Sequence, residues 1–235
     1  MPPTSPRPLH QALLSHLTSK HLLPTSTWLT TFLSTQRTDI QLPALQKTAL
    51  FRLQTSDITT TLSAPSASST FPADILDARI QSRILSDPIT VQVLEVEDVG
   101  RSRWSQIEAI ESAERGETTK GREVVRVVPS EENGDADALD ATSASGSAGP
   151  FKLLLQDIKG TRVYAFGMER IDGVNGGMPI GTKMVLRNAV VARGVVMLEV
   201  GSVSVLGGKI EGLDKMWREK RKERLKEGIE NTNAG

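Results

Sequence analysis

The chain has 235 residues, 38% of them hydrophobic, and its 28 basic side chains balance its 28 acidic ones. This size and apolar content allow one medium domain or two small ones with a buried core. The lack of cysteine excludes disulfides, a zinc–thiolate site and a thiol nucleophile. Because no apolar run reaches the roughly 20 residues of a membrane span, no membrane partner is expected.

The first sixty residues predict three short amphipathic helices. Residues 9–23 carry leucines at steps of three and four. A second helix begins at Thr25 or Ser26, whose hydroxyls can cap its free N–H groups, and a third opens at Pro43. Each of these helices can bury its apolar face only against the others, which predicts a three-helix bundle.

A polar connection follows the bundle. Residues 63–72, SAPSASSTFP, are rich in serine and proline. We expect Phe71, near the end of this connection, and Ile75 and Leu76, just after it, to pack at the junction between the bundle and the next domain. The bundle would then be docked on that domain rather than freely tethered to it.

The second half of the chain predicts a β-barrel. Short runs rich in valine, leucine, methionine and aromatics alternate with glycine-bearing turns, too closely spaced for helices. The expected strands are residues 89–97, 151–156, 162–169, 182–190, 194–200 and 202–206. Five or six strands without intervening helices fit a small closed barrel of the oligonucleotide/oligosaccharide-binding (OB) type.

About fifty residues, 98–150, separate the first two barrel strands, far more than a hairpin needs. The first part of this insertion can form a short helix around Trp104 and Ile107, whereas its acidic second part predicts no structure of its own. After the barrel, residues 209–235 predict a helix whose apolar stripe fades into alternating charges.

The predicted fold is therefore α+β: a helical bundle, an OB barrel with a long insertion between strands 1 and 2, and a C-terminal helix. The expected boundaries are residues 1–64 for the bundle, 65–88 for the connection, 89–208 for the barrel with 98–150 inserted, and 209–235 for the C-terminal helix and tail.

The barrel segment resembles the OB domain of the RecQ-mediated genome instability protein 1 family. Three marks in close order carry the resemblance: a Pro-x-Gly-Thr-Lys strand entry, an Arg-Gly-hydrophobic hairpin and a Val-x-Val-Leu-Gly-Gly exit into a helix. The residues are Pro179, Gly181, Thr182, Lys183, Arg193, Gly194, Val195, Val203, Val205, Leu206, Gly207 and Gly208. WLTTFLSTQ and ALFRLQTSDITTTL resemble the family's N-terminal helices, and SRWSQIEAIESAERG resembles the start of its insertion.

The resemblance implies a short, single-OB, non-catalytic subunit that binds topoisomerase III directly, in a complex with a RecQ-family helicase. Such complexes dissolve linked DNA intermediates in the nucleus. Lys183, Thr182 and Arg193 on the barrel, with Trp104 and Ile107 in the insertion, are the expected partner-contacting residues. We expect the insertion to enter near the DNA gate of the topoisomerase and bias its open and closed states.

No catalytic residue, metal ligand or cofactor is predicted. The three histidines, His10, His16 and His21, lie at spacings of six and five, which do not form a same-face ligand pair. The glycines of residues 173–177 are followed by no Lys-Ser/Thr pair, so they indicate a turn rather than a phosphate loop.

A nucleic-acid role is the alternative, because OB barrels often bind single-stranded DNA by aromatic stacking. Tyr164 and Phe166 share one strand face, where core packing is favoured over base stacking. Lys159, Arg162 and Arg187 could make weak, salt-sensitive contacts to DNA without sequence readout. A Tudor-type scaffold, like the related Tudor domain-containing protein 3, is a third reading, and the lack of a Tudor-like segment argues against it.

The run KRKERLK, residues 220–226, could be a nuclear localisation signal. A charged helix end is favoured, because acidic residues interrupt the run.

Overall fold

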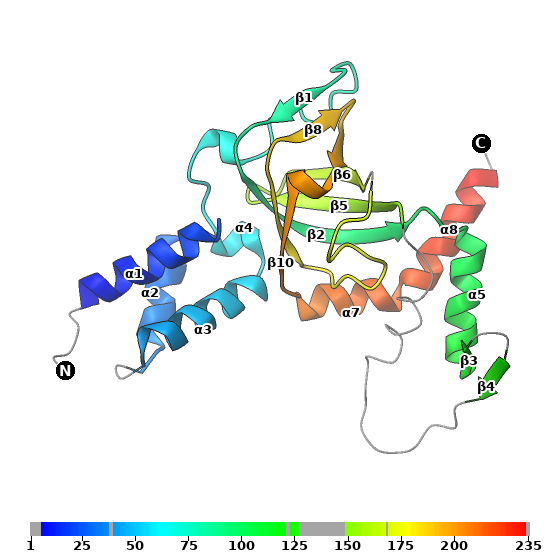
Figure 1. Ribbon diagram of the computed structural model, residues 1–235, viewed down its shortest axis with the longest axis horizontal. Helices are drawn as coiled ribbons and strands as arrows, with labels where there is room; N and C mark the ends of the chain where they lie inside the picture. The colour runs from blue at the N-terminus through cyan, green and yellow to red at the C-terminus, as the bar shows by residue number, and fades with distance from the viewer. Residues whose placement is uncertain (1–5, 38–39, 121–122, 127–148, 168, 234–235) are drawn as a thin grey trace.

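The computed structural model describes residues 6–37, 40–120, 123–126, 149–167 and 169–233. A curled sheet occupies the centre, with the N-terminal helices on one side and the C-terminal helices on the other (Figure 1). Within those ranges, no helix is both long enough and apolar enough to cross a membrane.

The predicted helical bundle is confirmed. Its helices are α1 (Pro6–Ser19), α2 (Ser26–Ser34), α3 (Leu42–Gln54) and the single turn α4 (Ile58–Thr61). Thr25 caps α2, because its hydroxyl accepts a hydrogen bond from the backbone N–H of Trp28 at 3.2 Å. The buried core of the bundle consists of Leu13, Leu17, Leu22, Leu29, Phe32, Leu45, Ala49, Leu53, Ile58 and Leu62.

The centre is an eight-stranded sheet in the order β1-β8-β9-β6-β5-β2-β7-β10. Its strands are β1 (Arg83–Leu85), β2 (Ile89–Asp98), β5 (Phe151–Asp157), β6 (Arg162–Gly167), β7 (Lys183–Leu186), β8 (Ala189–Ala192), β9 (Val195–Leu198) and β10 (Val203–Gly207). β6 and β9 pair in parallel, and the other described pairs in this sheet are antiparallel.

The sheet curls because β2 changes partners along its length. A bulge between Val93 and Glu95 interrupts its register with β5, and the residues from Ile89 to Gln92 also pair with β7. A bulge increases the bend and twist of a strand, which lets the sheet roll up. The result is the OB-type fold that the sequence predicts. The described sheet is curled but not closed as expected, because β1 and β10 stand at its two ends and do not pair with each other. Its core includes Val91, Leu153, Leu155, Val163, Met184, Leu186, Val196 and Leu198.

Three details of the barrel differ from the sequence prediction. Residues 182–190 form two strands, β7 and β8, because the chain turns at Arg187 and Asn188, where Asn188 has a φ of 50°. The short edge strand β1 was not predicted. Within the insertion, β3 (Glu117–Lys120) pairs with β4 (Glu123–Arg126), and the sequence did not predict these strands. The acidic part of the insertion, for which the sequence predicts no structure, lies outside the described residues except at its end.

The bundle is docked on the barrel, as predicted, through buried polar groups. Gln92 of β2 donates to the Asp57 carboxylate at 3.0 Å and to the side-chain carbonyl of Gln156 at 2.9 Å. The side-chain carbonyl oxygen of Gln92 accepts a hydrogen bond from the backbone N–H of Ile58 at 3.2 Å. Gln54 at the end of α3 donates to the Leu206 carbonyl at 2.6 Å. These bonds join α4 to β2 and α3 to β10, and the Gln92–Gln156 bond links β2 to β5 beside this contact.

The expected packing of the connection is only partly right. Phe71 and Ile75 are buried, and they belong to the core of the barrel rather than to the junction. The Phe71 backbone N–H donates to the buried Asp157 carboxylate at 2.9 Å. Leu76 was wrongly placed, because its side chain is exposed to solvent.

The first helix of the insertion packs against the C-terminal helices (Figure 1). Its helix α5 (Arg103–Glu114) lies along α8 (Arg221–Asn233), where the Arg103 guanidinium donates to the Gly228 carbonyl at 2.7 Å. The predicted single C-terminal helix is divided at Lys220 into α7 (Glu211–Glu219) and α8.

The α7 helix is fixed to the barrel by one buried carboxylate. Asp214 accepts hydrogen bonds from the Ile180 backbone N–H at 2.8 Å and the Arg218 guanidinium at 3.0 Å. Trp217, one turn further along the helix, is buried in the core of the barrel. The C-terminal helices therefore hold α5 in a defined place beside the barrel.

Candidate protein-interaction surface

The strands of the barrel carry apolar side chains on both of their faces. On β6, Val163 and Ala165 are buried in the core, while the alternate residues Tyr164 and Phe166 point outward. An antiparallel sheet with one solvated face usually carries polar residues there. We call the outward-facing apolar residues the outer sheet face: Ile84, Leu154, Tyr164, Phe166, Val190, Val195 and Met197.

The strand register brings these residues into two rows that cross the sheet. In the first row, Ile84 of β1 is opposite Val190 of β8, and Val190 is opposite Met197 of β9. Met197 is in turn opposite Phe166 of β6. Side chains in such cross-strand positions touch one another, so the row is continuous over four strands. Ile84, at its end, is 63% exposed.

The second row centres on Tyr164. This residue is opposite Val195 of β9 on one side and Leu154 of β5 on the other. The Tyr164 ring is 45% exposed, and the Lys152 ammonium lies 4.3 Å from its centroid. The ring thus offers a large apolar surface to solvent at the middle of the sheet.

Charged side chains border the outer sheet face. Glu97 of β2 pairs with Lys152 at 3.7 Å and with Arg103 of α5 at 3.0 Å. Arg162 is exposed at the start of β6. An apolar centre with a charged edge is the usual anatomy of a protein–protein interface. Chemically, the face can bury apolar surface of a partner and orient that partner through its rim.

Lys183, the first expected contact residue, lies in the interior. Its side chain is 0% exposed, and the ammonium donates to the Gly181 carbonyl at 2.7 Å. Burial lowers the pKa of Lys183 from 10.5 to about 8, and the charge of Asp57 acts in the opposite direction. Lys183 therefore has no surface to offer a partner in this structure, and its surroundings give it a role inside the barrel.

Thr182, from the same motif, is also internal. Its hydroxyl donates to the Pro179 carbonyl at 2.6 Å and lies 3.1 Å from the Gly208 carbonyl. The preceding Gly181 has a φ of 91°, and a Cβ there would lie 2.5 Å from Ile210. The Pro-Ile-Gly-Thr-Lys motif thus ties β7 to the end of β10 and the start of α7.

The other expected contact residues fall into two groups. Trp104 is 69% exposed on the surface of α5, and Arg193 is exposed in the β8–β9 turn. Both can reach a partner. Ile107, one turn beyond Trp104, is buried, so it fixes α5 in place rather than extending the exposed surface.

The residues expected to touch DNA lie in two turns. Lys159 and Arg162 are exposed at the β5–β6 turn. Arg187 is exposed at the β7–β8 turn, where its guanidinium lies against the ring of His21. Burial and the Arg187 charge lower the pKa of His21, so this pair belongs to the contact between the bundle and the barrel.

The described residues include no cluster of three histidine, aspartate or glutamate side chains that could hold a metal ion. The sequence reasoning did not find the outer sheet face, because Tyr164 and Phe166 were favoured as core residues. A signal was present: runs such as Val195–Leu198 are apolar at both phases of the strand alternation. A two-sided core or an exposed apolar face both produce that pattern.

The curled sheet, its long insertion and the flanking helices define an OB-fold protein whose sheet exposes an apolar face. Residues 71–221 match the family described as RMI1, N-terminal OB-fold domain, and residues 17–61 match RMI1, N-terminal helical domain. The chain belongs to the RMI1 family, as the sequence motifs predict. It is 30% identical over 192 residues to RecQ-mediated genome instability protein 1 of Schizosaccharomyces pombe, covering 77% of this chain and 80% of that relative.

Proposed function

We propose that this chain is a non-catalytic subunit of a nuclear RecQ helicase–topoisomerase III complex. In it the chain binds topoisomerase III directly and promotes decatenation and the dissolution of recombination intermediates. Membership of the RMI1 family supports a role in genome maintenance in a RecQ pathway. The observation that carries the proposal is the outer sheet face, because a scaffold subunit needs a surface that a protein can cover.

The proposed interface consists of the outer sheet face and the exposed end of α5. Ile84 and Tyr164 provide the exposed apolar surface on the sheet, and Trp104 provides a large aromatic side chain on the insertion. Aromatic side chains often dominate the free energy of protein association. The sheet would supply most of the affinity, and the insertion would act on the topoisomerase.

The test compares binding of topoisomerase III to three single variants of the full chain. Ile84→Glu and Tyr164→Glu each place a charge in the proposed interface, and we expect each to weaken binding at least about 100-fold. Phe51→Glu is the matched control, because Phe51 is 64% exposed on α3, away from the sheet. Circular dichroism checks that all three variants are folded.

Equal affinity of all three variants for topoisomerase III would reject the outer sheet face as the interface. Loss of binding in Phe51→Glu alone would move the interface to the helical bundle. Retained binding in Phe51→Glu with loss in the other two is the result that the proposal requires.

Single-stranded DNA binding is the second candidate, and one observation favours it. Tyr164 is an exposed ring on β6 with the Lys152 ammonium beside it, and β5 and β6 form the face that OB domains commonly use for oligonucleotides. A tight complex of the chain alone with oligothymidine, weakened steeply by salt and lost in Tyr164→Glu, would favour this function.

A further inference from the structure

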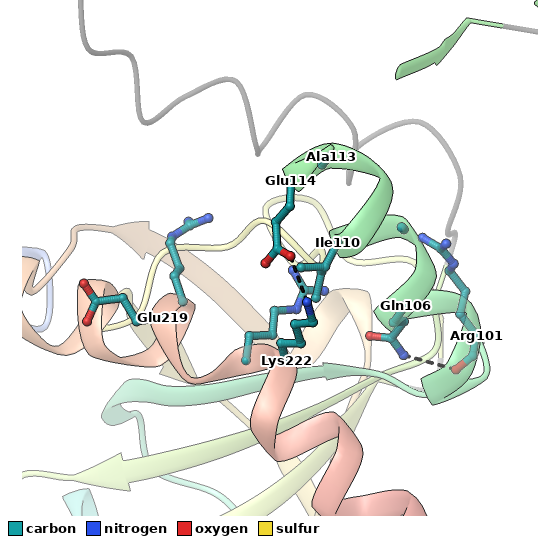
Figure 2. Close-up of a pocket in the computed structure, with 10 residues that line it drawn as sticks. Arg101, Gln106, Ile110, Ala113, Glu114, Glu219 and Lys222 are labelled. Carbon is teal, nitrogen blue, oxygen red and sulfur yellow. Dashed lines mark hydrogen bonds and ion pairs between the residues drawn. The ribbon is translucent and has the colours of Figure 1, made fainter. Parts of the chain in front are cut away.

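A pocket of about 320 Å³ lies between α5 on one side and α7 and α8 on the other (Figure 2). This volume is at the lower end of the range for ligand sites in proteins. The pocket is away from the strands of the outer sheet face, and nothing in the proposed function uses it. We call it the α5–α8 pocket.

One wall of the α5–α8 pocket is apolar. It is formed by Ala109, Ile110 and Ala113, which lie on the side of α5 that faces α8. The small side chains of Ala109 and Ala113 leave room beside Ile110. This wall can accept one apolar side chain of a ligand.

The opposite wall is basic, but two of its cations already have partners. Lys222 of α8 pairs with Glu114 at 2.8 Å and with Glu111 at 3.2 Å, and Figure 2 shows the pair with Glu114 at the edge of the pocket. Arg218 of α7 pairs with the buried Asp214 at 3.0 Å. The Lys222 pairs join α8 to α5, whereas the Arg218 pair lies within α7.

Arg221 and Arg101 complete the basic side of the pocket. Across the described residues, neither guanidinium has a carboxylate within ion-pair distance. Arg221 lies over the Trp217 ring at 5.5 Å, and Arg101 makes a long contact of 3.4 Å with the Ser105 hydroxyl. Both therefore keep donor capacity for an anion.

The electrostatic surroundings of Arg221 point the same way. Burial lowers its pKa, and so do the positive charges of Arg218, Arg101 and Arg224, whereas Asp98 acts in the opposite direction. A partly buried cation among three others is relieved by an incoming negative charge.

We propose that the α5–α8 pocket binds an acidic peptide segment of a partner protein. A carboxylate of the peptide pairs with Arg221 and Arg101, and a neighbouring apolar side chain of the peptide lies against Ile110 between the two alanines. Bidentate arginine–carboxylate pairs supply direction as well as affinity. The chain then has two separate binding sites, which suits a subunit that joins other proteins.

The residues that line the pocket favour a peptide over nucleic acid. Glu114 and Glu219 are among them, and their charges repel the continuous phosphates of a DNA strand. Aromatic rings are missing from the described lining, so a base has no platform on which to stack. An acidic peptide with single carboxylates can avoid the two glutamates.

The test is fluorescence anisotropy of the full chain with a labelled peptide, Glu-Asp-Leu-Asp-Glu, at 150 mM salt. Two matched peptides replace either the acids by their amides or the leucine by serine. We expect saturable binding of the first peptide and a loss of about tenfold or more for each of the others. Arg101→Gln and Arg221→Gln should each weaken binding about tenfold. Lys215→Gln, the control on the exposed side of α7, should change it less than about twofold.

Several results would overturn the proposal. These are no saturable binding of the acidic peptide, equal binding of its amide version, or unchanged binding in both arginine variants. Displacement of the peptide by oligothymidine at lower concentration than by unlabelled peptide would assign the pocket to nucleic acid instead. Because topoisomerase III is not in the assay, the outcome is independent of the proposed function.

Discussion

Lys183 belongs to the motif that carries the family resemblance, and yet its side chain is buried inside the protein. Its ammonium is buried, and it donates a hydrogen bond to the Gly181 carbonyl, which holds the turn that leads into β7. Asp57, whose charge favours the protonated form of Lys183, comes from the helical bundle. Lys183 therefore interacts both with the turn before β7 and with Asp57 of the helical bundle. A substitution of Lys183 would change partner binding only by changing the structure of the barrel.

The buried ammonium predicts a pH dependence of stability. Below pH 8 both the folded and unfolded states hold the proton, and the folded state bears the whole desolvation cost. Between pH 8 and 10.5 the unfolded state holds more protons, so the free energy of unfolding rises with pH. The full rise is about 3 kcal/mol, from 1.4 kcal/mol per pKa unit.

Lys183→Met should remove this rise while keeping the fold, since a buried ion can be replaced by an apolar side chain of similar size at little cost. Urea denaturation of both proteins at pH 7, 8, 9 and 10 measures it. The expected result is a stability difference between the two proteins that changes steadily with pH above pH 8. A constant difference would contradict the buried, charged state of Lys183.

At the scale of elements, the sequence predicts those helices and strands that have a regular apolar spacing. It does not predict the strand boundaries that are set by tertiary contacts. The helices and most strands follow from apolar spacing and glycine turns. The division of residues 182–190 does not, because their apolar run continues through Arg187 and Asn188 and only the curl of the barrel requires a turn there. Likewise, β1 has three residues and exists through its pairing with β8.

The candidate site was less predictable than the fold. Trp104 could be found because an aromatic residue among charges has no core to join, and it is exposed. The burial of Ile107 and Lys183 could not be predicted, because it depends on how α5 and β7 pack in the folded chain and not on the local sequence pattern. The outer sheet face depends on the register of five strands, β1, β8, β9, β6 and β5, among which β1 with β8 and β9 with β6 pair across long stretches of sequence.

The polar junction between bundle and barrel gives a prediction at this scale. Gln92→Ala leaves the Ile58 N–H and the Gln156 carbonyl without their partner in a buried place. It should lower the free energy of unfolding by about 2 kcal/mol. Gln81→Ala, an exposed loop position, is the control and should change it by less than about 0.5 kcal/mol. Chemical denaturation measures both, and equal stability of the two variants would show that the junction contributes nothing.

At the scale of the whole molecule, the C-terminal helices hold α5 beside the barrel. Salt bridges from Lys222 and the hydrogen bond from Arg103 to Gly228 fix α5 on α8. Trp104 is therefore exposed on a helix whose first residue, Arg103, pairs with the rim residue Glu97 at 3.0 Å. A partner seated on the outer sheet face would meet the insertion at a defined position.

This arrangement predicts that Trp104 acts on the activity of topoisomerase III more than on its binding. Trp104→Ala should reduce stimulation of decatenation about tenfold and weaken binding less than about threefold, because we propose that the insertion biases the open and closed states of the topoisomerase gate. Met216→Ala, an exposed apolar position on α7, is the control. Full stimulation by the Trp104 variant would contradict a role of the insertion.

The most direct test of the central claim is calorimetric titration of the full chain into topoisomerase III without DNA, at physiological salt. The account predicts stoichiometric binding with a negative heat-capacity change, because apolar surface of the outer sheet face is buried. Raising the salt should weaken it only slightly. Failure of the chain to bind an active topoisomerase III, together with tight and salt-sensitive binding to oligothymidine, would contradict the claim and establish the single-stranded DNA function instead.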